Sequence, residues 1–128
     1  MARRERVAAE RRGRLAEALA ALALQLKGYR ILARRVRNAY GEIDLIARRG
    51  DTFAFIEVKA RRTPVAALES VSEVSWQRIS NAADAWAARH IPAQGDHGWR
   101  FDVVAVCPRR WPKHFRDAWR PDFALTNG

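Results

Sequence analysis

The sequence has one cysteine, few lysines and no long apolar run, and each shortage excludes a class of protein. Cys107 is the only cysteine, so no disulfide can form within the chain and a reducing cytoplasm is the expected compartment. With three scattered histidines and no second cysteine, a structural zinc site is not expected. No segment approaches the ~20 apolar residues of a membrane span, and residues 1–6 lack a signal-peptide core. We therefore expect a cytoplasmic protein that does not enter a membrane.

Positive charge is the largest compositional excess. The 128 residues carry a formal net charge of +10, nearly all of it from arginine, because lysine occurs only at Lys27, Lys59 and Lys113. Such a balance favours polyanionic partners, with nucleic acid first and acidic lipid second. Basic surfaces also occur on proteins that are merely soluble, so charge alone indicates a class of partner without deciding it.

A first helix is predicted by Leu15, Leu19, Leu22 and Leu26, which recur at intervals of three and four residues with alanines between them. The spacing is that of an amphipathic helix. Residues 1–12 form a basic N-terminal extension of this helix, and residues 107–128 are expected to be an irregular C-terminal tail. The chain is long enough for one domain, which we place over residues 1–128.

Strands are predicted over 29–37, 41–46, 53–59 and 99–106, and a second helix over 72–89. The first three strands are joined by short turns and would form an antiparallel meander. The second helix allows a parallel crossover to the last strand. We therefore expect an αβββαβ core of the α/β or α+β class, with a central mixed sheet flanked by helices.

Two of the predicted strands carry the residues with the clearest chemistry. Asp44 lies on one and Glu57, Val58 and Lys59 on the next, with a tight turn at residues 48–51 between them. Because side chains alternate along a strand, Glu57 and Lys59 share one face. Two carboxylates and an ammonium brought together on strands can hold a divalent cation and act on a phosphodiester. The pattern predicts a magnesium-dependent nuclease site.

The same residues also have a plainer interpretation. Glu42 and Asp44 can form a solvated strand edge, and Glu57 with Lys59 can be an exposed ion pair worth under about 1 kcal/mol. Asp102, on the last predicted strand, is expected to be structural and to pair with an arginine. Trp86 and Trp99 lie in core-like patterns, whereas Trp76 is the more exposed candidate for stacking on unpaired bases.

Three segments together resemble the YraN family of small bacterial proteins: GEIDLIA at 41–47, FIEVKAR at 55–61 and RFDVV at 100–104. The resemblance covers roughly residues 13–106. This family is similar to the PD-(D/E)XK nuclease superfamily, especially to archaeal Holliday-junction resolvases. It implies a restriction-endonuclease-like fold and a Mg²⁺- or Mn²⁺-dependent endonuclease that hydrolyses DNA, with branched DNA as a candidate substrate.

The resemblance also implies roles for individual residues. Asp44 and Glu57 would hold the metal together with the carbonyl oxygen of Val58, since magnesium prefers oxygen ligands and keeps several waters. Lys59 would orient or deprotonate the attacking water, or stabilise the transition state. Glu17 matches a first-helix glutamate of the superfamily and would hold a second metal or a metal-bound water. As a lone acid on an Arg-rich helix, it can equally be a salt-bridge partner.

Nucleic-acid contacts are expected from Arg61, Gln77 and Arg37. Arg61 matches an arginine of the family and can engage a phosphate bidentately. Gln77 lies where the family often has a lysine early in the second helix, a position at which this chain departs from the pattern with Ser75. The alternative function is a non-catalytic nucleic-acid-binding or adaptor protein that keeps the nuclease fold, and a third is a protein-interaction module for an acidic partner. A symmetric junction as substrate would suggest a homodimer.

Overall fold

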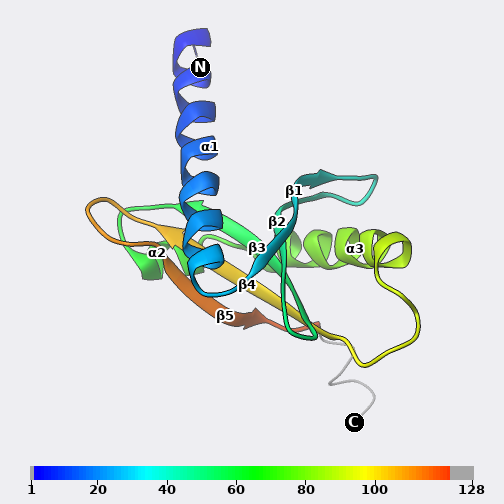
Figure 1. Cartoon of the computed structure of the whole chain (residues 1–128). Helices are drawn as coiled ribbons and strands as arrows, with labels where there is room; N and C mark the ends of the chain where they lie inside the picture. Colours follow the sequence, from blue (N-terminus) through cyan, green and yellow to red (C-terminus); the bar gives the residue numbers. More distant parts are fainter. Residues whose placement is uncertain (1, 122–128) are drawn as a thin grey trace.

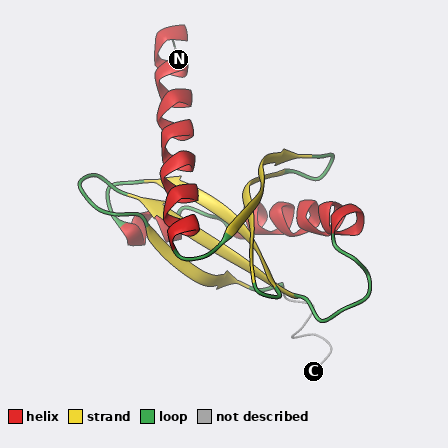
Figure 2. Ribbon diagram, in the orientation of Figure 1, coloured by secondary structure: helices red, strands yellow, loops and turns green. Residues whose placement is uncertain are grey.

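A five-stranded sheet with helices on both faces forms the body of the protein in a computed structural model, which describes residues 2–121 (Figures 1 and 2). The elements are α1 (Arg3–Leu26), β1 (Arg30–Arg37), β2 (Glu42–Arg49), β3 (Thr52–Ala60), α2 (Pro64–Glu69), α3 (Glu73–His90), β4 (Gly98–Val106) and β5 (Lys113–Trp119). The strands lie in the order β1-β2-β3-β4-β5. Only β3 and β4 run parallel, because the α2–α3 segment crosses over between them. The predicted αβββαβ core and mixed sheet are confirmed.

The fifth strand corrects the expectation of an irregular tail over residues 107–128. Residues 113–119 pair antiparallel with β4 and place Phe115 and Trp119 against the core under α3. Asp117 has a φ of 57°, and the register shifts beside it, so the alternation of apolar residues that marks a strand is interrupted. Residues 122–128 lie outside the described residues.

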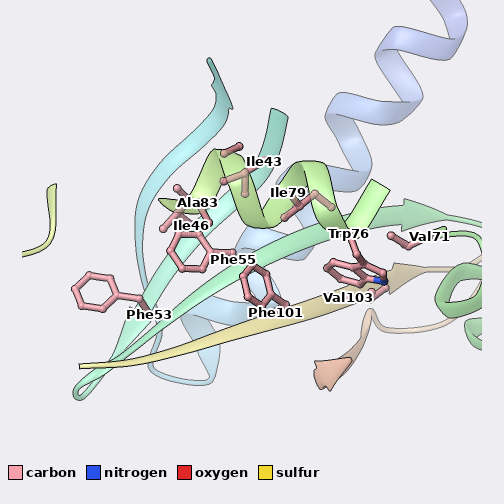
Figure 3. Close-up of a cluster of buried hydrophobic side chains, with 11 residues drawn as sticks. Ile43, Ile46, Phe53, Phe55, Val71, Trp76, Ile79, Ala83, Phe101 and Val103 are labelled. Carbon is pink, nitrogen blue, oxygen red and sulfur yellow. The ribbon is translucent and has the colours of Figure 1, made fainter. Parts of the chain in front are cut away.

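The face of the sheet under α3 holds the larger of its apolar clusters (Figure 3). Ile79 and Ala83 of α3 pack on Phe55 and Phe101 of the sheet. Trp76 corrects the expectation of an exposed ring, because only 5% of it is exposed and it stacks on Trp119. Ser72 caps α3 by accepting a hydrogen bond from the Ser75 amide, so the helix begins one turn before Trp76. That starting point turns the ring toward the sheet.

Trp99 corrects the sequence expectation in the opposite sense. It was expected to be packed, and 41% of it is exposed. Trp99 lies at the start of β4, beside the loop that follows α3, so only one side of its ring meets Phe55.

The other face of the sheet is covered by α1, which packs through alanines rather than leucines. Ala16, Ala20, Ala21, Ala23 and Leu24 are buried against β2, β3 and β4. Small side chains let the helix axis approach a sheet surface that is itself built of Leu45, Ile56 and Val104. The leucine stripe of the amphipathic pattern therefore faces away from the sheet. The N-terminal half of α1 extends beyond the sheet (Figure 1).

Asp102 is fully buried on β4 and anchors β5 and α1 to the sheet. Its carboxylate accepts hydrogen bonds from Arg100 at 2.8 Å and from the Asp117 amide at 3.0 Å. Nε2 of His114 lies 2.7 Å from the same carboxylate, and Nδ1 of that ring lies 2.7 Å from the Lys27 ammonium. The expected arginine partner of Asp102 is thus Arg100.

Among the described residues, no helix is long and apolar enough to cross a membrane.

Candidate functional site

The candidate site lies where β2 and β3 separate. Their antiparallel ladder ends at the pair Leu45 and Ile56, so Asp44 and Glu57 stand just beyond the last pair, on opposite strands. Beyond this pair, the side chain of Asp44 takes the place of a backbone acceptor for Val58. Its carboxylate accepts a 2.8 Å hydrogen bond from the amide of Val58. This bond fixes the Asp44 carboxylate beside Glu57.

Glu57 is the most perturbed acid of the site. Only 14% of its side chain is exposed, and its carboxylate lies 3.6 Å from the Lys59 ammonium. The pKa of Glu57 is raised from its usual 4.5 to about 8, first by burial and then by the adjacent Asp44 carboxyl, while Lys59 opposes the rise. When both carboxyl groups are ionised, they carry more negative charge than the Lys59 ammonium balances. Such a pair favours an additional proton or a cation.

Glu17 stands on the α1 side of an open cleft of about 530 Å³ that Asp44 also lines. It does not point freely toward Asp44, because its carboxylate receives a 2.8 Å hydrogen bond from Nε of Arg35. Arg35 has a φ of 51°, a conformation that costs a non-glycine residue free energy and often accompanies functional sites. Arg14 and Arg37 line the same cleft together with Glu10 and Glu42, so its lining carries charges of both signs.

The structure thus brings Asp44, Glu57 and Lys59 together, and it adds Glu17 to the cleft as one partner of an ion pair. Within residues 2–121, no three or more acidic, histidine or cysteine side chains gather in a group that could hold a metal. A metal here would be held by two carboxylates and completed by backbone oxygen and water. Val58 contacts the site through its amide nitrogen. Its carbonyl as a metal ligand stays a prediction.

The three expected nucleic-acid contacts lie at the surface in different places. Arg37 borders the cleft and pairs with Glu42 at 2.7 Å, with both side chains largely exposed. Arg61 follows β3 and is exposed, with its guanidinium on the Ala60 carbonyl. Gln77 is exposed on the second turn of α3.

Arg35, the arginine that meets Glu17, is not among the residues expected from the sequence. A pairing across 18 residues and a positive φ leave no local signature in the sequence. The only available signal was the alternation of arginines along β1.

Comparison with known proteins gives a consistent family match. A model described as the uncharacterised protein family UPF0102 matches residues 16–106. A UPF0102 protein of Mesorhizobium japonicum is 57% identical over 113 residues, which cover 86% of this chain and 87% of the relative. One from Agrobacterium fabrum is 58% identical over 86% of this chain and 89% of its own length. One from Paramagnetospirillum magneticum is 52% identical over 90% and 92%. None of these descriptions names an activity, a metal or a substrate.

Proposed function

The chain belongs to the uncharacterised protein family UPF0102, and we propose that it is a metal-dependent nuclease that hydrolyses phosphodiester bonds in DNA. The observation that carries the proposal is the pair of Asp44 and Glu57 at the opening of the β2–β3 ladder, with Lys59 beside it. This arrangement of two carboxylates and a lysine on adjacent strands is the one expected of the PD-(D/E)XK superfamily. Membership of that superfamily is therefore part of the proposal.

The residues present suit Mg²⁺ or Mn²⁺. Asp44 and Glu57 are hard oxygen donors, and the raised pKa of Glu57 marks a place where negative charge lacks compensation. These two carboxylates and the Val58 carbonyl would hold the cation, and waters would complete its coordination. A divalent cation supplies Lewis-acid activation of water and neutralises charge that develops on the phosphate.

Lys59 lies beside Glu57 and would take part in the same reaction. Its side chain is 27% exposed and its ammonium lies 3.6 Å from the Glu57 carboxylate, so it is held at the site yet open to substrate. From there it positions the attacking water and stabilises the charge of the transition state. Removing such a group typically costs 10²-fold or more in rate.

Glu17 is a second acid at the site, and a bound phosphate would determine whether Arg35 still pairs with it. In the protein alone, Arg35 holds the Glu17 carboxylate. A DNA phosphate that enters the cleft competes for the guanidinium, since arginine binds phosphate bidentately. Glu17 is then released toward Asp44 and becomes available to a second metal or to a metal-bound water.

DNA is the favoured substrate because the chain carries a net charge of +10 and three arginines lie in the cleft beside its acidic side chains. Arg37 and Arg61 would contact the backbone, and Gln77 would replace a lysine contact on α3. A branched molecule is the candidate substrate within this class. The second candidate function is a non-catalytic DNA-binding or adaptor protein. The absence of a three-ligand metal group among the described residues favours that second candidate.

A cleavage panel separates the two functions. Four-way-junction, duplex and single-stranded DNA are incubated with the full chain and Mn²⁺ or Mg²⁺. We expect metal-dependent cleavage that is lost in Asp44→Ala and Lys59→Ala, while DNA binding in a gel-shift assay is retained. Asp51→Ala is the matched control, because Asp51 is an exposed aspartate on the turn of the same hairpin. DNA that stays uncut with wild-type protein, together with salt-sensitive binding that is indifferent to metal and to Asp44, identifies the adaptor.

A further inference from the structure

Three cations without an acidic partner lie near the C-terminal end of α1. Lys27 follows the helix, Arg49 ends β2 and Arg116 lies on β5, and all three residues are exposed. Among the ion pairs within residues 2–121, none involves any of the three. The acid beside them, Asp102, is fully buried and already paired with Arg100. No carboxylate of the described chain therefore compensates these three charges.

Neutral groups hold two of these cations in place. The Lys27 ammonium can only donate, so its 2.7 Å contact with Nδ1 of His114 is a hydrogen bond to an imidazole whose Nε2 faces Asp102. Arg49 donates to the Lys27 carbonyl at 3.3 Å, and its guanidinium lies 4.7 Å from the centre of the Tyr29 ring. These contacts fix the two cations without neutralising them. Each cation keeps further N–H donors for a ligand.

The like charges of this cluster repel one another. The pKa of Lys27 is lowered, first by partial burial and then by the charges of Arg116 and Arg49, while Asp102 opposes the shift. The end of a helix contributes only about half of an elementary negative charge, which does not balance three cations. An anion bound among them would relieve the repulsion. The cluster is therefore typical of a site for a multiply charged anion such as phosphate.

A cavity of about 180 Å³ adjoins Lys27 between the end of α1 and β5. Lys27, His114 and Trp111 line it, and none of the described residues in its lining is acidic. Lys113 also borders the cavity, but its ammonium lies 5.9 Å from the centre of the Phe115 ring and is not one of the cations of the cluster. Pockets for drug-sized ligands measure about 300–1,000 Å³, so this cavity suits a phosphate group rather than a whole nucleotide.

We propose that the three cations bind a backbone phosphate of single-stranded nucleic acid, with a neighbouring base stacked on Trp111. Trp111 is 59% exposed and lines the cavity beside Lys27, so its ring offers the surface on which an unpaired base stacks. A free phosphate ion would use the cations but not the tryptophan. The cavity is bordered by β4 and β5, whereas the cleft is bordered by β1 and β2, near the other edge of the sheet. The proposal does not depend on the nuclease function.

Fluorescence anisotropy of a labelled oligothymidine tests the site on the full chain, with a chelator present so that no metal-dependent cleavage occurs. Lys27→Gln and Arg116→Gln should each weaken binding about 10-fold and reduce its salt slope by about 0.7, because one contact to a single-strand phosphate is lost. Trp111→Ala should also weaken binding about 10-fold, and Trp111→Phe should restore most of the affinity. Arg89→Gln is the matched control, because it removes the same charge from an exposed position in the last turn of α3.

Two measurements guard against a structural effect of the substitutions. Circular dichroism during thermal unfolding reports whether each variant remains folded. Arg116 is exposed and forms no side-chain hydrogen bond within residues 2–121, so Arg116→Gln tests the site without touching the hydrogen bonds of Asp102.

Three outcomes would overturn the proposal. The first is equal affinity of Lys27→Gln, Arg116→Gln and Arg89→Gln for the oligothymidine. The second is binding that Trp111→Ala leaves unchanged, because the site would then take a phosphate without a base. The third is isothermal titration in which inorganic phosphate binds wild-type protein as tightly as the oligothymidine does. DNA that stays uncut in the cleavage panel would count against the nuclease function alone, since this binding is measured without metal.

Discussion

Replacing Glu57 with glutamine should stabilise the metal-free protein, and only at high pH. The folded-state pKa of Glu57 is raised from 4.5 to about 8, first by burial and then by Asp44. The folded protein therefore binds this proton more tightly than the unfolded chain does. Stability from the protonated group is fully present below about pH 4.5, falls as the pH rises, and is lost above about pH 8.

The size of the effect follows from the same two values. At about 1.4 kcal/mol for each pH unit between them, the wild-type protein loses up to about 5 kcal/mol across this window. Glutamine keeps the shape of the neutral acid and can donate a hydrogen bond to Asp44 without ionising. Above about pH 8, Glu57→Gln should therefore be more stable than wild type by a few kcal/mol, and near pH 5 the two should differ little.

Urea denaturation in the presence of a chelator measures this difference at each pH. Glu42→Gln is the control, because Glu42 lies on the neighbouring strand but is 60% exposed and paired with Arg37. The difference in stability between Glu42→Gln and wild type should be the same at both pH values. Added Mn²⁺ should restore wild-type stability at high pH and leave Glu57→Gln unchanged, because the cation takes the place of the proton. Equal stabilisation by Glu57→Gln at both pH values would show that the pKa of Glu57 is not raised in the folded protein.

Three further predictions concern the fold and the cleft. Asp102→Asn should destabilise the protein by about 3–5 kcal/mol in calorimetry, because Arg100 loses its buried partner. Burial alone would raise the pKa of Asp102, but hydrogen bonds from His114 and Arg100 outweigh it and lower that pKa, so this stabilisation should be present at neutral pH and lost in acid. Arg35→Ala should weaken DNA binding measured by fluorescence anisotropy and reduce its salt slope by about one. Trp76→Ala should cost about 3–5 kcal/mol in urea denaturation and Trp99→Ala clearly less, and equal costs would contradict their different burial.

The sequence was sufficient to bring Asp44 and Glu57 together. Both lie in short runs rich in β-branched and aromatic residues, and a short turn containing Gly50 joins those runs, so the hairpin follows from local patterns. The adjacency of Lys59 follows from the period of a strand. The hydrogen bond from Val58 to Asp44 could not be predicted, because it depends on the ladder ending at Leu45.

The orientation of α1 shows where a periodic pattern is insufficient. Leu15 and Leu22 define one stripe at helical spacing, while Ala16, Ala20 and Leu24 define another. Which stripe faces the sheet depends on how closely the helix approaches it, and that distance is a property of the assembled sheet.

The partner of Glu17 also depends on tertiary structure. Arg35 reaches it from a different element, and its own backbone adopts a positive φ. β5 was missed for a related reason, since the unusual backbone at Asp117 interrupts its alternation.

Single-turnover cleavage of a labelled four-way junction, with and without Mn²⁺, measures whether Asp44 and Glu57 form a metal-dependent nuclease site. We predict cleavage by wild-type protein only with the cation, and a loss of at least about 10²-fold in rate for Asp44→Asn with junction binding preserved. A junction that wild-type protein binds but leaves intact under these conditions would contradict the account. So would cleavage that proceeds equally well without Asp44.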